Sequence, residues 1–136
     1  MKQKFIDFYM NIAEDAANRL STCKRLTVGS VVVKDDNILS FGYNGTFPGE
    51  DNCCEGEDGL TKDSVIHAEE NTFMKLLRRG GVGTEGATIF ITHQPCINCA
   101  RMIANCGITT VYYKNEYRCN KGIDLLRKRD ISVIKI

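Results

Sequence analysis

The stretch ATIFITHQPCINCARMIANCGITTVYY, residues 87–113, largely decides the fold that we expect for this chain. An apolar run at 87–92 is typical of a buried strand, and a helical pattern follows from Cys96 to Asn105, where Gly107 closes it. Pro95 suits the start of that helix, because its fixed φ is compatible with the first turn. Residues 108–113 then return to strand character. The stretch therefore predicts a strand, a helix and a second strand.

The segments on both sides continue this alternation. We expect helices at 5–21, 66–79, 96–105 and 123–128, and strands at 27–34, 38–43, 87–92, 108–113 and 131–136. The order αββαβαβαβ predicts one α/β domain over residues 1–136, a three-layer α/β/α sandwich around a five-stranded mixed sheet. Because a helix joins the last two strands, we expect these strands to be parallel.

Apolar residues at helical spacing in the first helix are expected to face the core. They are Phe5, Phe8, Tyr9, Ile12, Ala16 and Leu20.

Composition restricts the class of partner. The formal net charge is +1 and the isoelectric point is near 7.5, which predicts neither a nucleic-acid nor a membrane surface. The N-terminus lacks the apolar stretch of a signal peptide, no apolar run is long enough for a membrane span, and seven cysteines are an odd number. We therefore expect a cytoplasmic protein with a small-molecule substrate.

Two motifs carry the chemistry, His67-Ala68-Glu69 and Pro95-Cys96-Ile97-Asn98-Cys99. Catalytic zinc takes three protein ligands and leaves a fourth position open, and His67, Cys96 and Cys99 make three. Glu69 lies too close to His67 in sequence to stack with it along a helix, so we place both at a helix N-terminus. There Glu69 is predicted to be a proton shuttle.

A CxxC pair alone is also typical of a redox site or of half a structural zinc site. The additional histidine and glutamate favour catalysis, because a structural site has no use for a free carboxylate. This combination is the signature of zinc nucleobase deaminases.

The resemblance extends to other blocks: Val28-Gly29-Ser30-Val31-Val32-Val33, Gly42-Tyr43-Asn44-Gly45, His67-Ala68-Glu69-Glu70-Asn71 and Pro95 to Ala100. Over nearly its whole length the chain resembles deoxycytidylate (dCMP) deaminases. The resemblance implies the cytidine deaminase type of sheet and hydrolysis of dCMP to dUMP and ammonia in pyrimidine deoxynucleotide metabolism. It also implies a homo-oligomer, with a hexamer favoured, that is activated by dCTP and inhibited by dTTP with Mg²⁺.

The resemblance assigns roles to residues of the site. Glu69 would pass a proton from water to the cytosine ring and then to the leaving amine, while the Ala68 N–H would bind the pyrimidine O2. Asn44 would bind the deoxyribose, although its place in Tyr-Asn-Gly equally suits a turn residue. Tyr117 is a candidate wall of the nucleotide site, and the alternative is ordinary edge packing.

Phosphate recognition should come from cations, for which Lys24, Arg25 and Arg118 are the candidates. The alternative for each is a solvated surface charge. Arg78 and Arg79 could serve a subunit interface or a regulator, or compensate a helix dipole.

A second zinc ion is a further possibility. Cys23, Cys53 and Cys54 match positions from which some relatives build an additional site, but residues 55–66 contain no histidine to complete it. The alternative is that they are reduced, free cysteines. His93 is expected to be a packing or supporting group.

Three functions remain in competition at this point. A nucleotide deaminase is favoured over a deaminase of bases in tRNA or single-stranded nucleic acid, because the low net charge argues against the latter. The third is a non-catalytic zinc or nucleotide-binding module, which the presence of Glu69 disfavours.

Overall fold

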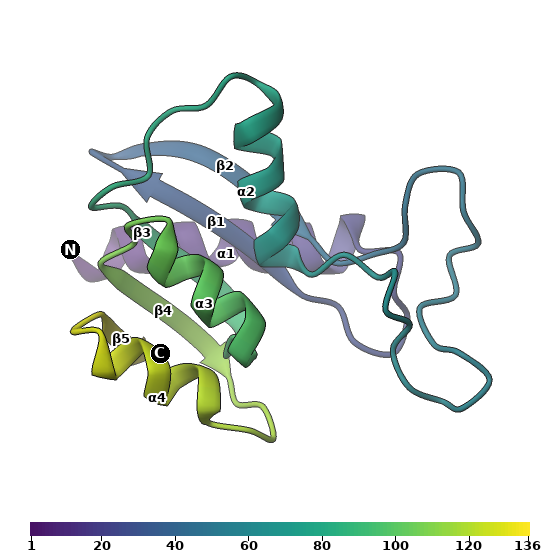
Figure 1. Cartoon of the computed structure of the whole chain (residues 1–136). Helices are drawn as coiled ribbons and strands as arrows, with labels where there is room; N and C mark the ends of the chain where they lie inside the picture. Colours follow the sequence, from purple (N-terminus) through teal and green to yellow (C-terminus); the bar gives the residue numbers. More distant parts are fainter.

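The computed structural model describes residues 1–136 and is built around one five-stranded sheet (Figure 1). Its strands are β1 (Gly29–Lys34), β2 (Asn37–Tyr43), β3 (Thr88–His93), β4 (Thr110–Asn115) and β5 (Ser132–Lys135). They are ordered β2-β1-β3-β4-β5. β1 is antiparallel to β2 and β3, whereas β3, β4 and β5 run parallel to one another. The mixed sheet and the parallel last strands are confirmed.

Four helices cover the two faces. They are α1 (Gln3–Leu20), α2 (Ala68–Arg78), α3 (Ile97–Asn105) and α4 (Lys121–Lys128). Figure 1 shows α1 behind the sheet and the other three helices in front of it. The three-layer prediction is therefore confirmed. No helix is both long enough and apolar enough to cross a membrane.

The two crossovers determine where a site can form. α3 joins β3 to β4 and α4 joins β4 to β5, so the carboxyl ends of these parallel strands share one edge of the sheet. Ligand sites of such sheets lie at that edge. The Pro95-Cys96 turn follows β3 there and leads directly into α3.

The hairpin between β1 and β2 follows local sequence chemistry. Asp35 and Asp36 form its turn with φ of 51° and 60°. Two consecutive positive φ values are the geometry of the tight turns that match the twist of paired strands, and aspartate tolerates them.

The prediction for the first helix was partly wrong. Phe8 is 54% and Leu20 44% exposed, and Phe5 also lies at the surface. The buried face is instead formed by Ile6, Tyr9, Met10, Ala13, Ala16 and Ala17. The physical reason is close approach: a Cβ added to Gly29 of β1 would collide with the Ala13 carbonyl. The side of α1 that carries Ala13, Ala16 and Ala17 lets the two backbones approach this closely, whereas Phe5 and Phe8 stay at the surface.

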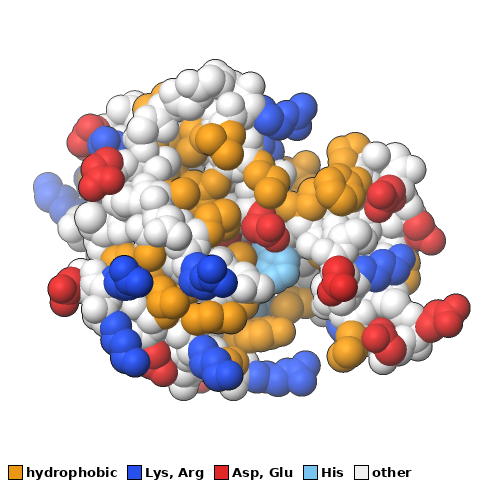
Figure 2. Space-filling view, in the orientation of Figure 1, with side chains coloured by type: hydrophobic (Ala, Val, Ile, Leu, Met, Phe, Trp, Pro, Cys, Tyr) orange, Lys and Arg blue, Asp and Glu red, His pale blue; other side chains and the backbone are white.

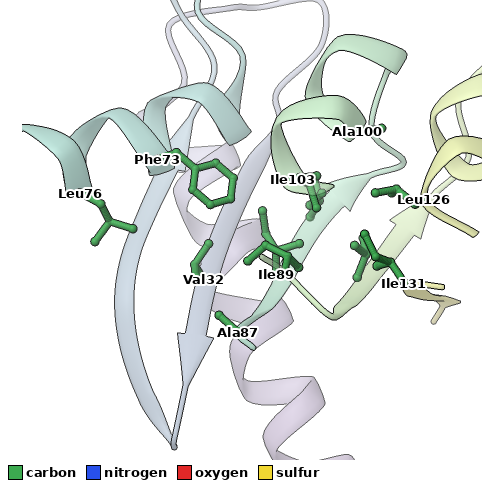
Figure 3. Packing of buried hydrophobic residues seen from close by; sticks show 12 residues of the cluster. Val32, Phe73, Leu76, Ala87, Ile89, Ala100, Ile103, Leu126 and Ile131 are labelled. Atoms are coloured by element: carbon green, nitrogen blue, oxygen red, sulfur yellow. The ribbon is translucent and has the colours of Figure 1, made fainter. Parts of the chain in front are cut away.

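The main core lies between the sheet and helices α2, α3 and α4 (Figure 3). Phe73 of α2 packs with Val32 of β1, and Ile103 of α3 with Ile89 of β3. Ile89 and Ile103 are completely buried. A second cluster, including Tyr9 and Phe90, fills the space under α1. The core thus fixes the spacing of α2 and α3, the two helices that carry the motifs.

Candidate metal centre and active site

The structure brings the three predicted ligands together. His67 is the residue before α2, and Cys96 is the residue before α3. The His67 Nδ1 lies 3.4 Å from the Cys99 Sγ and 3.7 Å from the Cys96 Sγ. The ligand atoms of all three residues lie within 4.8 Å of one another, and no other part of the chain gathers three such side chains.

This arrangement fits zinc. Bonds of about 2.0–2.3 Å to nitrogen and sulfur in a tetrahedron require neighbouring ligand atoms roughly 3.5 Å apart, which agrees with the distances here. The site also lies between two helix N-termini, whose partial positive charge favours thiolates. His67, Cys96 and Cys99 can therefore hold one zinc ion.

The three groups affect one another's ionisation. Hydrogen bonding with Cys99 lowers the pKa of Cys96 to about 4. Hydrogen bonding with Cys96 raises the pKa of His67 to about 9, and it also raises the pKa of Cys99 far above its usual range. One thiolate is thus formed readily, while zinc would have to displace protons from the other two ligands.

Glu69, the predicted proton shuttle, lies next to the three ligands. It is the second residue of α2 and only 5% exposed. Burial raises the pKa of its carboxyl group to about 7, although a backbone hydrogen bond and the charge of His67 act in the opposite direction. A carboxyl group with a pKa near neutrality can both accept and release a proton, which is what an acid–base catalyst needs.

Glu70 has a role that was not predicted. Its Oε1 accepts a hydrogen bond of 3.0 Å from the His67 N–H, which caps the start of α2. The cap holds the backbone of a metal ligand. The spacing of His67 and Glu70 was a visible signal, because a capping carboxylate normally stands three residues after the helix cap.

Asn44 is 9% exposed, and its side chain is largely occupied. Its Oδ1 accepts hydrogen bonds from the Ser21 Oγ at 2.6 Å and the Val28 N–H at 2.8 Å, and its Nδ2 donates to the Leu26 carbonyl at 2.8 Å. Asn44 therefore holds the segment that joins α1 to β1. One Nδ2 hydrogen is left for another acceptor.

Gln94, which was not predicted to be a site residue, links the Pro95-Cys96 turn to the loop between β4 and α4. Only 4% of it is exposed, and its Nε2 donates to the Cys119 carbonyl at 2.8 Å and the Asn120 Oδ1 at 3.1 Å. A Cβ added to Gly122 would collide with the Pro95 and Cys96 carbonyls, so α4 begins directly against this turn. No sequence motif signals this contact.

The remaining nucleotide-site candidates lie at the surface. Tyr117 is 43% exposed, and Arg118 follows it in the loop that Gln94 holds. Arg25 donates to the Gly59 carbonyl at 2.6 Å, so it is tied to the long 44–67 segment. Lys24 and Arg118 make no hydrogen bond or ion pair, and both are free to meet an anion.

The second metal site finds no support. Cys23 and Cys54 are joined in a disulfide, so neither sulfur is a thiolate, and the exposed Cys53 makes a hydrogen bond to the Glu55 carbonyl instead. The pairing also differs from the expectation of free cysteines. His93 is not among the ligands: its Nδ1 lies 3.0 Å from the Thr92 Oγ1, and burial lowers its pKa.

The surface around the site is hollowed. Figure 2 shows a histidine side chain in a hollow between the main body and the protruding part of the chain, with hydrophobic side chains around it. Figure 1 identifies the protruding part as the long segment that leads into α2. A small polar molecule can reach the base of such a hollow.

Comparison with known proteins agrees with the geometry. Residues 3–115 match the family model of the cytidine and deoxycytidylate deaminase zinc-binding region. Deoxycytidylate deaminase of Mycobacterium phage D29 is 34% identical over 124 residues, 81% of this chain and 94% of that protein. ComE operon protein 2 of Bacillus subtilis is 41% identical over 101 residues, 72% of this chain but 53% of that protein, so the match spans about half of this relative.

Among solved structures, dCMP deaminase from the cyanophage S-TIM5, in complex with dCMP and dUMP, is 44% identical. It superposes with a TM-score of 0.93 over 100% of this chain and 99% of that one.

The fold, the three ligands and the buried Glu69 define a zinc-dependent hydrolase of the deaminase class. The family match makes this assignment specific. The chain belongs to the cytidine and deoxycytidylate deaminase family.

Proposed function

We propose that this protein catalyses the hydrolysis of dCMP to dUMP and ammonia. The observation that carries the proposal is the buried carboxyl group of Glu69 beside three zinc ligands. The choice of dCMP is supported by the S-TIM5 enzyme, which was crystallised with dCMP and dUMP and matches this chain over its full length. The low net charge is consistent with a free nucleotide as substrate.

When bound, zinc supplies a polarised water that loses its proton near neutral pH. Glu69 accepts that proton and delivers it to N3 of the ring as the oxygen bonds to C4. It then takes the second proton of the water from the new C4 hydroxyl and gives it to the amino group, so that the C4–N bond breaks, ammonia leaves and a C4 carbonyl remains. The overall reaction consumes one water. A positioned shuttle of this kind contributes about 10²–10⁴ in rate.

The chain's other residues would orient the pyrimidine and the sugar. Ala68 is the first residue of α2, where the helix itself leaves the N–H groups without partners, so its N–H can donate to the pyrimidine O2. The unused Nδ2 hydrogen of Asn44 can donate to a deoxyribose oxygen.

Phosphate recognition is proposed for Lys24 and Arg118, with Tyr117 as a wall and Arg25 in a supporting role. Lys24 and Arg118 are preferred over Arg25 because their side chains are free, whereas Arg25 already donates to the Gly59 carbonyl. Arg118→Ala should raise KM for dCMP and leave KM for deoxycytidine unchanged. Arg101→Ala, a change of an exposed arginine on α3, is the matched control.

One assay tests the reaction itself. Purified protein with zinc should release ammonia from dCMP, but much less from deoxycytidine or from an RNA hairpin. Glu69→Gln should abolish release and retain zinc, whereas Glu14→Gln, on α1 at the other face of the sheet, should remain active. An active Glu69→Gln protein refutes the shuttle. Faster release from RNA would favour a nucleic-acid base deaminase, and no release from any substrate would favour a non-catalytic module.

Regulation is a separate part of the proposal and rests on the family resemblance. We propose a cytoplasmic homo-oligomer, with a hexamer favoured, that dCTP with Mg²⁺ activates and dTTP inhibits. Lys75, Arg78 and Arg79 line a hollow of about 540 Å³ over β2. Lys75 and Arg79 donate to the Phe41 and Leu39 carbonyls, so Arg78 is the cation left to contact a phosphate group. Flat substrate curves with both nucleotides would remove regulation from the proposal, and light scattering would report the oligomer.

A further inference from the structure

A buried set of polar side chains lies beneath the first turn of α2. We define the polar seam as Ser30 of β1, Ser40 of β2 and Thr72 of α2. All three are almost completely buried, at 0%, 5% and 0% exposure. They lie between α2 and the sheet, beside apolar side chains such as Val32 and Phe73. None of them belongs to the metal site or to the proposed shuttle.

The polar seam contacts one backbone group at the start of α2, the Ala68 carbonyl. The Ser30 Oγ lies 3.1 Å from the Ala68 carbonyl, and the Thr72 Oγ1 lies 2.9 Å from the same oxygen. The two hydroxyls are also in hydrogen-bond contact with each other. The two hydroxyl groups have one proton each, and only one of these protons can lie between the two hydroxyl oxygens. At least one hydroxyl therefore donates to the Ala68 carbonyl.

Two more contacts extend the attachment of α2 to the sheet. The Ser40 Oγ donates to the Thr72 carbonyl at 2.8 Å, and the Tyr43 N–H donates to the Asn71 Oδ1 at 3.2 Å. A Cβ added to Gly42 would collide with the Thr72 hydroxyl and the Ala68 carbonyl. The first turn of α2 therefore rests directly on the backbone of β2.

The geometry relates this attachment to Glu69. Ala68 and Thr72 stand four residues apart and share the helix face that meets the sheet. Glu69 is the next residue after Ala68 and is rotated by about 100° from it, away from that face. With its backbone held on one side, Glu69 has few ways to move relative to His67 at the start of the same helix. Hydrogen bonds depend on direction, so they add constraints on the position and rotation of this turn to those of apolar packing.

We propose that the polar seam positions Glu69 for proton transfer, with Ser30 and Thr72 as positioning residues rather than catalytic ones. The inference rests on the proposed deamination. A misplacement of about 1 Å can cost roughly 10²-fold in rate, so loss of the seam should lower kcat rather than raise KM.

The test uses the zinc-loaded protein. Ser30→Ala combined with Thr72→Val removes both hydroxyls and nearly keeps the packing volume. We expect kcat for dCMP to fall about tenfold or more, with KM and zinc content little changed. The single variant Thr72→Ser keeps a hydroxyl group at this position, so its kcat should stay close to that of the wild type.

Thr92→Val is the matched control. Thr92 is also buried, at 3%, and its hydroxyl accepts a hydrogen bond from the Gly29 N–H. Its loss should lower stability to a similar degree and leave kcat unchanged. An unchanged kcat in the double variant, or an equal fall in Thr92→Val, would overturn the proposal. If the double variant does not fold, Thr72→Val alone carries the same comparison.

Hydrogen exchange separates this inference from the proposed function. Amides in the first turn of α2 should exchange faster in the double variant but not in Thr92→Val, whatever the substrate. If the wild-type protein does not deaminate dCMP, the proposed function is refuted. If hydrogen exchange is unchanged in the double variant, the positioning role of the polar seam is refuted.

Discussion

Replacing Gln94 by methionine tests whether this side chain anchors the loop that carries Tyr117 and Arg118. Methionine nearly preserves the volume of glutamine, so the packing of this buried side chain should survive while both of its hydrogen bonds are lost. Two hydrogen bonds contribute about 0.5–1.5 kcal/mol each, which gives a loss of about 1–3 kcal/mol. For a domain of this size the melting temperature should fall by about 4–12 °C. KM for dCMP should rise several-fold, because the loop that carries Tyr117 and Arg118 loses its anchor.

Thermal unfolding and steady-state ammonia release measure the two effects. Gln3→Met is the control: Gln3 is exposed on α1 and makes one hydrogen bond, to Asp7, so its loss should change stability by no more than about 0.5 kcal/mol. Zinc content should stay the same in both variants. Equal melting temperatures for the two variants would show that Gln94 does not anchor the loop. An unchanged KM together with a lower melting temperature would show that the loop does not contact substrate.

Three further changes test the site and the core. Removal of zinc by a chelator should abolish ammonia release and added zinc should restore it; activity that survives chelation would contradict a catalytic metal. Glu70→Ala should cost about 1 kcal/mol and weaken zinc binding, because the His67 N–H loses its acceptor, whereas Glu70→Gln keeps an acceptor oxygen; equal losses would argue against the cap. Ile103→Ala should cost about 2–5 kcal/mol in urea unfolding, because the side chain is completely buried. Ile134→Ala, at a 39% exposed position, is its control, and similar losses would place the core elsewhere.

Much of the fold was predictable because local patterns and topology rules agree. The run at 87–113 has the strand and helix signals of its β3-α3-β4 unit, and a helix between two strands of one sheet requires them to be parallel. The face of α1 was not predictable in the same way. Phe5 and Phe8 continue the apolar stripe of Tyr9, but the close approach of Gly29 buries the side that carries Ala13 and Ala17 and leaves both phenylalanines at the surface.

The metal site was predictable for a similar reason. Zinc limits its ligands to a few residue types, and two short motifs supply them together with a carboxylate. The supporting groups were harder to foresee. Ser30, Thr72 and Gln94 are ordinary polar residues in the sequence, and only their burial against particular carbonyls reveals what they do.

Cysteine pairing shows the same limit. Cys23, Cys53 and Cys54 are equivalent candidates in the sequence, whereas the structure joins Cys23 to Cys54 and leaves Cys53 at the surface. Pairing depends on which sulfurs come within bonding distance, and the path of the long segment before α2 decides that.

The sequence by itself determined the class of chemistry and the order of helices and strands, because metal ligation and backbone periodicity depend on residue type and local spacing. Only the tertiary structure decided which face of α1 is buried and that α2 is hydrogen-bonded to β1 and β2 beneath Glu69. Those outcomes depend on contacts between residues distant in the chain, and packing brings such residues together only once the sheet and its helices have formed.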